Sequence, residues 1–157
     1  MTSRDALADR YRRIDGQLAG LFAKYGAAAD LEARLATAVA VLHHKMPHFF
    51  WTGVYRLVGD DLVVGPYQGP LACAVLERGK GVCRACVERR ETIVVPDVHA
   101  FADHIACDPR SRSEIVVPII RDGAVLGVLD VDSDRPEAFG AVDAEGLERI
   151  VATVLGA

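Results

Sequence analysis

Four cysteines are the residues of this 157-residue sequence best suited to chemistry: Cys73, Cys83, Cys86 and Cys107. The N-terminus opens on a polar stretch and lacks the apolar segment typical of a signal peptide. Cysteines in a chain without an export signal more often serve as free thiols, metal ligands or redox groups than as structural disulfides. A small buried thiol without reactivity is the common alternative, and Cys107 fits it least because its surroundings in the sequence are polar.

Two residue pairs, one Cys–Cys and one His–Cys, also have the spacing of metal ligands. Cys83-x-x-Cys86 is followed by His104-x-x-Cys107, which together offer three thiolates and an imidazole. Such a set predicts a zinc-binding structural domain as one alternative. The first pair, however, falls on a predicted short helix ahead of a strand and not in a zinc knuckle, which disfavours that alternative.

Three carboxylates are predicted to lie near the cysteines. Asp130 and Asp132 end an otherwise apolar strand and are two residues apart, so they share a face at a separation of roughly 7 Å. Glu114 opens the neighbouring strand of the same predicted hairpin, and we expect all three to converge. An exposed strand end is the alternative. Carboxylates that lie close together cannot all ionise cheaply, so one of them should hold a proton that it can donate.

The elements that position these residues follow from the apolar pattern. Helical spacing covers 4–24, continues from an N-cap at Asp30 to Pro47, and returns after Asp143. From Phe49 the period changes to two, with turns at glycine-containing positions. Predicted strands cover 49–57, 62–64, 72–76, 92–95, 114–121 and 125–131, with a short helix over 82–90 and an irregular stretch over 96–112.

Composition and charge restrict the class of protein. The chain is 51% hydrophobic and 25% charged, with a net charge of −4. These values exclude a disordered chain and argue against nucleic acid or an anionic membrane as the main partner. No apolar run approaches the ~18 residues that a membrane span needs. We therefore predict one α+β domain, with a central antiparallel sheet and helices packed on it.

The motifs then resemble those of a known family, the free methionine-R-sulfoxide reductases, which are GAF domains that reduce the R epimer of free methionine sulfoxide. The resemblance covers about residues 30–155, in the same order and with matching cysteine spacing. It implies a GAF domain over 30–157 that carries the pocket, with the helix in 1–29 as part of the same domain. The matching motifs are Gly65-Pro66-Tyr67-Gln68-Gly69, Ala72-Cys73, Gly79 to Cys83, Asp97-Val98-His99, His104-Ile105-Ala106-Cys107-Asp108, Ser113-Glu114-Ile115-Val116 and Gly127-Val128-Leu129-Asp130-Val131-Asp132-Ser133.

The resemblance assigns roles to three of the cysteines. Cys107 corresponds to the nucleophile, Cys73 to the resolving thiol, and Cys83 to a third cysteine that can take part in disulfide formation. Cys86 has no counterpart in the family pattern, so it leaves open which thiol is the auxiliary one. Attack on the sulfoxide sulfur would leave a sulfenic acid, which condenses with a second thiol to form a disulfide.

The resemblance also implies a substrate pocket. Glu114, Asp130 and Asp132 match the substrate-binding carboxylates, and Trp51 and Tyr55 match the aromatic residues that line the pocket. Because Trp51 and Tyr55 flank a glycine on one strand face, we expect an apolar slot there for a methyl thioether.

The resemblance also implies the partners. We expect free methionine-R-sulfoxide as substrate, a thioredoxin-like dithiol as reductant, no cofactor or metal, and a cytoplasmic protein without a nucleic-acid or membrane partner. The oligomeric state stays open, with a homodimer among the options. A GAF sensor module that binds a small ligand without turnover is the remaining alternative, since the fold alone allows it.

Overall fold

One antiparallel sheet of five strands, in the order β2-β1-β5-β4-β3, organises the chain. The computed structural model describes residues 1–105 and 107–156. The strands are β1 (Trp51–Val58), β2 (Asp61–Gln68), β3 (Ile93–Val95), β4 (Ser113–Arg121) and β5 (Ala124–Ser133). The helices are α1 (Ser3–Tyr25), α2 (Leu31–Lys45), α3 (Val82–Arg89) and α4 (Ala141–Leu155), with 3-10 turns at Gly26–Ala28 and Val98–Ala100.

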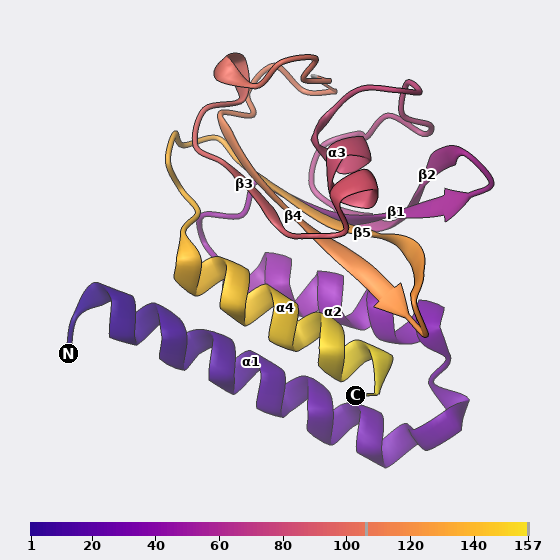
Figure 1. The fold of residues 1–157 in the computed structure, drawn as a ribbon. Coiled ribbons are helices and arrows are strands. Elements are labelled where there is room, and N and C mark those ends of the chain that lie inside the picture. The colour runs from indigo at the N-terminus through magenta and orange to yellow at the C-terminus, as the bar shows by residue number, and fades with distance from the viewer. Residues whose placement is uncertain (106, 157) are drawn as a thin grey trace.

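The helices lie unequally on the two faces of the sheet (Figure 1). The long helices α2 and α4 cover one face, and α1 packs outside them, mainly along α4. The opposite face carries the short helix α3 and the loops around it. The predicted fold class, an α+β domain with a central antiparallel sheet and packed helices, is confirmed.

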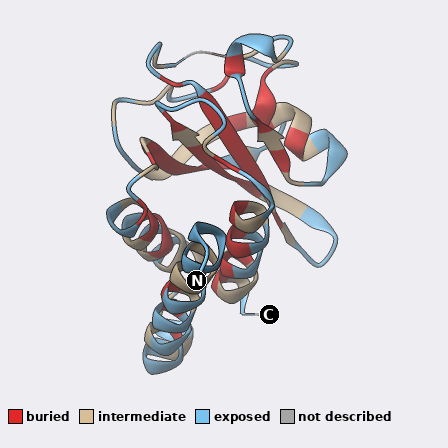
Figure 2. Cartoon of the chain, turned by 90° about the vertical axis from the view of Figure 1, so that its left-hand side faces the viewer, coloured by how far each residue is buried: buried red, intermediate tan, exposed pale blue. Residues whose placement is uncertain are grey.

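The face under α2 and α4 is an apolar core. It is filled by residues such as Leu18, Leu42 and Ile150, and Figure 2 shows the buried strands between helices whose outer sides are exposed. Gly146 on α4 lets α1 approach closely, because a Cβ there would lie 2.3 Å from Cγ of Tyr11. Removing these apolar surfaces from water provides most of the stabilisation of the fold.

Local signals in the sequence explain the helix boundaries. Asp30 caps α2, as predicted, by accepting a hydrogen bond from the backbone of Ala33 at 2.9 Å. The last helix begins at Ala141, three residues earlier than expected, so Asp143 lies inside its first turn. There the carboxylate accepts from the backbone N–H of Gly140 at 2.9 Å and from the Tyr11 hydroxyl at 2.7 Å.

Two expectations for the strands were wrong. The segment 72–76 does not form a strand and makes a single bridge, between Val75 and Val63 of β2. Phe49 precedes β1 and packs in the core under α2 and α4, whereas Trp51 and Tyr55 face the opposite side. The chain between Phe49 and Trp51 therefore does not alternate as an extended strand would.

No helix in residues 1–105 and 107–156 is both long and apolar enough to cross a membrane.

Candidate active site

A pocket opens on the α3 face of the sheet, where three strands and two loops meet. It is lined by apolar and aromatic side chains together with carboxylates, an imidazole and cysteine sulfur. The lining residues include Phe50, Trp51, Tyr55, Leu71, Cys83, His104, Ile105, Cys107, Asp108, Ser111, Glu114, Asp130 and Asp132. Apart from Cys73, every residue that the sequence predicted for the site lines this pocket.

Cys73 is joined to the pocket through a disulfide with Cys107. The two residues are 34 apart in sequence, and their Cα atoms lie 5.6 Å apart. Cys107 is exposed and Cys73 is half-buried. The hydroxyl of Tyr55 donates to the backbone carbonyl of Cys73 at 3.0 Å, which holds the Cys73 segment against β1. The disulfide is thus fixed at the mouth of the pocket, where a second thiol can reach it.

The three predicted carboxylates converge because β4 and β5 are paired neighbours. Glu114 lies opposite Asp132, and Asp130 is two residues back on the same face of β5. Glu114 and Asp130 are buried, with 5% and 6% exposure. The hydroxyl of Ser111 donates to Oδ1 of Asp132 at 2.8 Å, and Nε2 of His104 lies 3.4 Å from Oε2 of Glu114.

These carboxylates resist ionisation. Burial raises the pKa of Glu114, of Asp130 and of Asp132 well above the ordinary range, and their mutual repulsion raises each pKa further. The pKa of His104 is lowered by burial, so its imidazole does not neutralise the group fully. The raised pKa values favour the protonated forms, so the set is suited to hold a proton that can be given to a ligand.

An aromatic wall bounds the other side of the pocket. The ring of Trp51 stacks on Tyr55 with centroids 5.8 Å apart and on Tyr67 with centroids 5.5 Å apart. The expected slot over Gly53 is not open, because a Cβ there would lie 2.3 Å from the Trp51 ring. The ring itself covers the glycine, and the apolar surface that it offers to a ligand is its opposite side or edge.

Two buried polar atoms of the pocket residues have no hydrogen-bond partner among the described residues: Nε1 of Trp51 and Oδ1 of Asp130. The first is a donor and the second an acceptor. Buried polar groups are normally paired, so unpaired ones in a pocket are suited to a ligand that brings both kinds of group.

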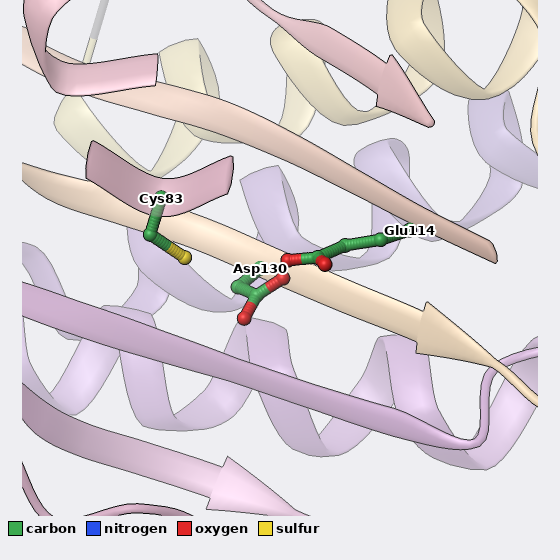
Figure 3. Close-up of side chains that lie close together, drawn as sticks. All are labelled: Cys83, Glu114 and Asp130. Carbon is green, nitrogen blue, oxygen red and sulfur yellow. The ribbon is translucent and has the colours of Figure 1, made fainter. Parts of the chain in front are cut away.

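The remaining thiols lie on α3. Cys83 points into the pocket toward Asp130, and burial and the nearby carboxylates raise its pKa (Figure 3). Cys86, one turn on, is fully buried and donates to the carbonyl of Val116 at 3.6 Å, and burial raises its pKa to about 12. The predicted zinc ligands do not converge in residues 1–105 and 107–156. Cys107 is bonded to Cys73, and His104 lies beside Glu114.

Sequence reasoning did not find three contributors to the site. Ser111 orients Asp132, Tyr67 extends the aromatic stack, and His104 contacts Glu114 instead of a metal. Tyr67 belongs to a matching motif, but nothing in its spacing indicates contact with Trp51. Ser111 and His104 lie in the irregular stretch 96–112, whose path has no periodicity from which to predict contacts.

Comparison with known proteins agrees with this geometry. Residues 30–157 match the GAF domain family. The chain is 42% identical to the free methionine-R-sulfoxide reductase of Escherichia coli (strain K12) over 120 residues, which are 76% of this chain and 73% of that protein. It is also 37% identical to GAF domain-containing protein A of Dictyostelium discoideum over 150 residues, 95% of this chain and 92% of that protein.

A solved structure supports the same relationship. The X-ray structure of free methionine-R-sulfoxide reductase from Neisseria meningitidis, in complex with its substrate, superposes with a TM-score of 0.87 at 41% sequence identity. The match covers 94% of this chain and 87% of that one. The chain therefore belongs to the GAF domain family and, within it, to the free methionine-R-sulfoxide reductases.

Proposed function

We propose that this protein reduces free L-methionine (R)-S-oxide to L-methionine through a thiolate, sulfenic acid and disulfide cycle. The observation that carries the proposal is the Cys73–Cys107 disulfide, which lies at the mouth of a pocket with buried carboxylates inside. The relatives named for this activity match most of the chain, which supports the same reaction here.

The first step uses the Cys107 thiolate and one proton. The thiolate sulfur bonds to the sulfoxide sulfur, and the S–O bond breaks as the oxygen leaves with the proton as hydroxide. The hydroxide oxygen then bonds to the Cys107 sulfur as the new S–S bond breaks, which leaves a sulfenic acid on Cys107 and releases methionine. The buried carboxylates supply the proton, since burial and mutual repulsion raise their pKa and favour their protonated forms. Without that proton the oxygen would have to leave as oxide, which is strongly basic and therefore a poor leaving group.

The second step regenerates the thiol pair. The Cys73 thiol condenses with the sulfenic acid, releasing water and forming the disulfide that the structure contains. A dithiol donor, which we propose to be thioredoxin-like, then reduces the disulfide by thiol exchange. The exposure of Cys107 supports this step because the incoming thiolate must reach one of the two sulfurs. Cys83 is proposed as an auxiliary thiol that can enter disulfide exchange.

Recognition of the free amino acid is assigned to the pocket walls. Glu114, Asp130 and Asp132 carry negative charge for the ammonium group, and the unpaired Oδ1 of Asp130 is ready to accept from it. Trp51 and Tyr55 provide the apolar surface for the methyl thioether. A charge-assisted contact of this kind contributes about 1.5–3 kcal/mol, which corresponds to roughly a 10- to 150-fold preference.

The wider organisation is also proposed. We place the protein in the cytoplasm, where thioredoxin-like donors are found, and include residues 1–29 in the same domain as 30–157. The packing of α1 along α4, with Tyr11 bonded to Asp143, supports that single domain. A homodimer is proposed as the assembly to test.

Reductase activity on two substrates tests the function. With dithiothreitol as reductant, free methionine-R-sulfoxide should be converted to methionine, whereas the N-acetylated or peptide-bound sulfoxide should be almost inert. Comparable rates on the free and N-acetylated substrates would refute the proposal that the carboxylates bind the substrate ammonium. Binding of the free sulfoxide without any turnover would instead favour the sensor alternative.

A single-turnover experiment separates the two cysteines of the disulfide. In Cys73→Ser, reduced enzyme should still release one methionine per chain, because the nucleophile is intact, but cycling with thioredoxin should slow. Loss of the first turnover would give Cys73 a part in the sulfoxide chemistry itself.

A further inference from the structure

Three side chains at the inner end of the pocket form a set of a different kind. One ligand-type atom of each of Cys83, Glu114 and Asp130 lies within 4.8 Å of the others. The residues come from three elements, α3, β4 and β5, and Figure 3 shows the thiol and the two carboxylates turned toward one another. All three are buried and all three line the pocket, so the set is shielded yet reachable from its mouth.

A second observation indicates that this set is incomplete without a ligand. Asp130 is more than nine-tenths buried, and its Oδ1 has no hydrogen-bond partner in the described chain. Among the described residues that line the pocket, none is a Lys or Arg. Buried carboxylates without a neighbouring cation are costly, so a positive ligand is favoured at this position.

We propose that a thiophilic divalent cation of the Zn²⁺ class binds reversibly to Cys83, Glu114 and Asp130. One sulfur and two carboxylate oxygens with an open fourth position suit zinc, which prefers few ligands and accepts thiolate. Mg²⁺ and Ca²⁺ take oxygen ligands, so the Cys83 sulfur in the set disfavours them. On binding, the Cys83 thiol releases its proton to solvent and forms a metal–sulfur bond, with no change of oxidation state.

Only small side-chain adjustments are required. Zinc bonds of about 2.0–2.3 Å place tetrahedral ligand atoms roughly 3.2–3.8 Å apart. The ligand atoms already lie within 4.8 Å, so they need to approach by about 1.0–1.6 Å at most. Cys83 is in the first turn of α3, next to pocket space, and Glu114 has a flexible side chain at the start of β4.

This site differs from the structural zinc site considered from the sequence. It uses one cysteine instead of three, and its cation is proposed to bind reversibly. Its occupation would block the carboxylates to which the proposed function assigns the substrate ammonium, so the cation should inhibit in competition with substrate. The binding itself does not depend on the proposed function, whereas the inhibition does.

The test uses the oxidised protein, in which Cys73 and Cys107 are bonded to each other and cannot bind metal. Cd²⁺ is titrated and read by the ultraviolet cadmium–thiolate absorption, and Zn²⁺ affinity is measured by competition with a chromophoric chelator. We expect about one ion per chain. Changing groups outside the ligand set already costs about 10- to 100-fold in metal affinity, so Cys83→Ser should weaken binding by about 100-fold or more.

Cys86→Ser is the matched control, because Cys86 is a buried thiol on the same helix but outside the set. It should keep the wild-type affinity and the cadmium absorption. Asp130→Asn, which retains the thiol, should also weaken binding and guards against a folding defect in Cys83→Ser. Absence of binding to the oxidised wild type, or equal losses in the two cysteine variants, would overturn the proposal.

Activity gives a separate result. In single turnovers without added thiol, Zn²⁺ should slow methionine release from the wild type, an excess of substrate or EDTA should reverse this, and Cys86→Ser should respond equally. Equal inhibition of Cys83→Ser would place the inhibiting zinc on Cys73 and Cys107. That result would refute the claim that zinc inhibits by binding to Cys83, Glu114 and Asp130. A protein that binds zinc through Cys83 but never reduces the sulfoxide would refute the proposed function and leave the metal site standing.

Discussion

The two faces of the sheet differ in how they treat buried polar groups. Under α2 and α4 the core is apolar, and its main buried acid, Asp143, accepts hydrogen bonds from Tyr11 and Gly140 and lies 3.1 Å from Nε2 of His48. On the α3 face, buried carboxylates lie beside one another and a buried acceptor of Asp130 has no partner among the described residues. The helix face stabilises the fold, and the pocket face has unfavourable contacts that suit it to a ligand.

The largest effect is expected at the mouth of the pocket. Cys107→Ser should lower turnover by at least about 10⁴-fold, in the range seen when a covalent nucleophile is removed. Its stability should match that of the reduced wild type, because Cys107 is exposed and the substitution is nearly isosteric. Methionine release and thermal unfolding measure the two properties. Substantial residual activity would move the nucleophile to another residue.

In the core on the α2 and α4 face, we expect a substitution to lower stability and to leave activity nearly unchanged. Leu42 is a fully buried residue of α2, and Leu42→Ala should lower the free energy of unfolding by about 2–5 kcal/mol through lost burial and a cavity. The activity per folded molecule should stay close to that of the wild type. Urea unfolding and active-site titration check this, and a fall in specific activity comparable with that of Cys107→Ser would contradict the separation of the two faces.

Between these extremes lies the carboxylate set. Glu114→Gln should reduce turnover of free methionine-R-sulfoxide by roughly 10- to 150-fold, which corresponds to about 1.5–3 kcal/mol for a lost charge-assisted contact. The weak reaction with N-acetylmethionine sulfoxide, which has no ammonium, serves as the matched control and should change less. An equal loss on both substrates would leave Glu114 with a proton-donor role alone.

A smaller effect is expected at Asp130, where a substitution should increase the stability of the fold. The pKa of Asp130 is raised in the folded protein, so its contribution to stability is present below the unfolded pKa of about 4 and is lost as pH rises toward the folded pKa. The free energy of unfolding should therefore fall as pH rises from about 4 to 7. Asp130→Asn should flatten this fall and be about 1–2 kcal/mol more stable at pH 7, at the expense of activity. A steeper fall in the variant would refute the assignment.

The smallest change is predicted for Cys86→Ser. Its hydroxyl can keep the contact with the Val116 carbonyl, so stability should change by no more than about 1 kcal/mol and turnover with thioredoxin should be unaffected. Thermal unfolding and steady-state kinetics measure both. A large loss of turnover would show that the Cys83-x-x-Cys86 pair takes part in the cycle.

Periodic segments were predicted well from sequence because local signals agreed with tertiary packing. The cap at Asp30 and the apolar stripe after it define α2, and Asp122-Gly123, both with positive φ, connects β4 to β5. That hairpin explains why the convergence of Glu114 with Asp132 could be predicted, since pairing and alternation determine both positions.

The parts not predicted depend on non-local contacts. Segment 72–76 has residues suited to a strand, yet the disulfide of Cys73 and a single bridge to β2 leave it irregular. The position of the Trp51 ring over Gly53 follows from its stack with Tyr67 on the neighbouring strand. Neither feature has a signature in the spacing of residues along the chain.

The Cys73–Cys107 bond also closes a covalent ring, because it links positions 34 residues apart and encloses α3 and β3. Closing a ring of this size restricts the unfolded chain and is worth about 3–4 kcal/mol in the chain-entropy description. Oxidation by substrate should therefore make the molecule harder to unfold, and each encounter with reductant should remove that gain. In the proposed cycle, the chain alternates between a tethered and an untethered form once in every turnover.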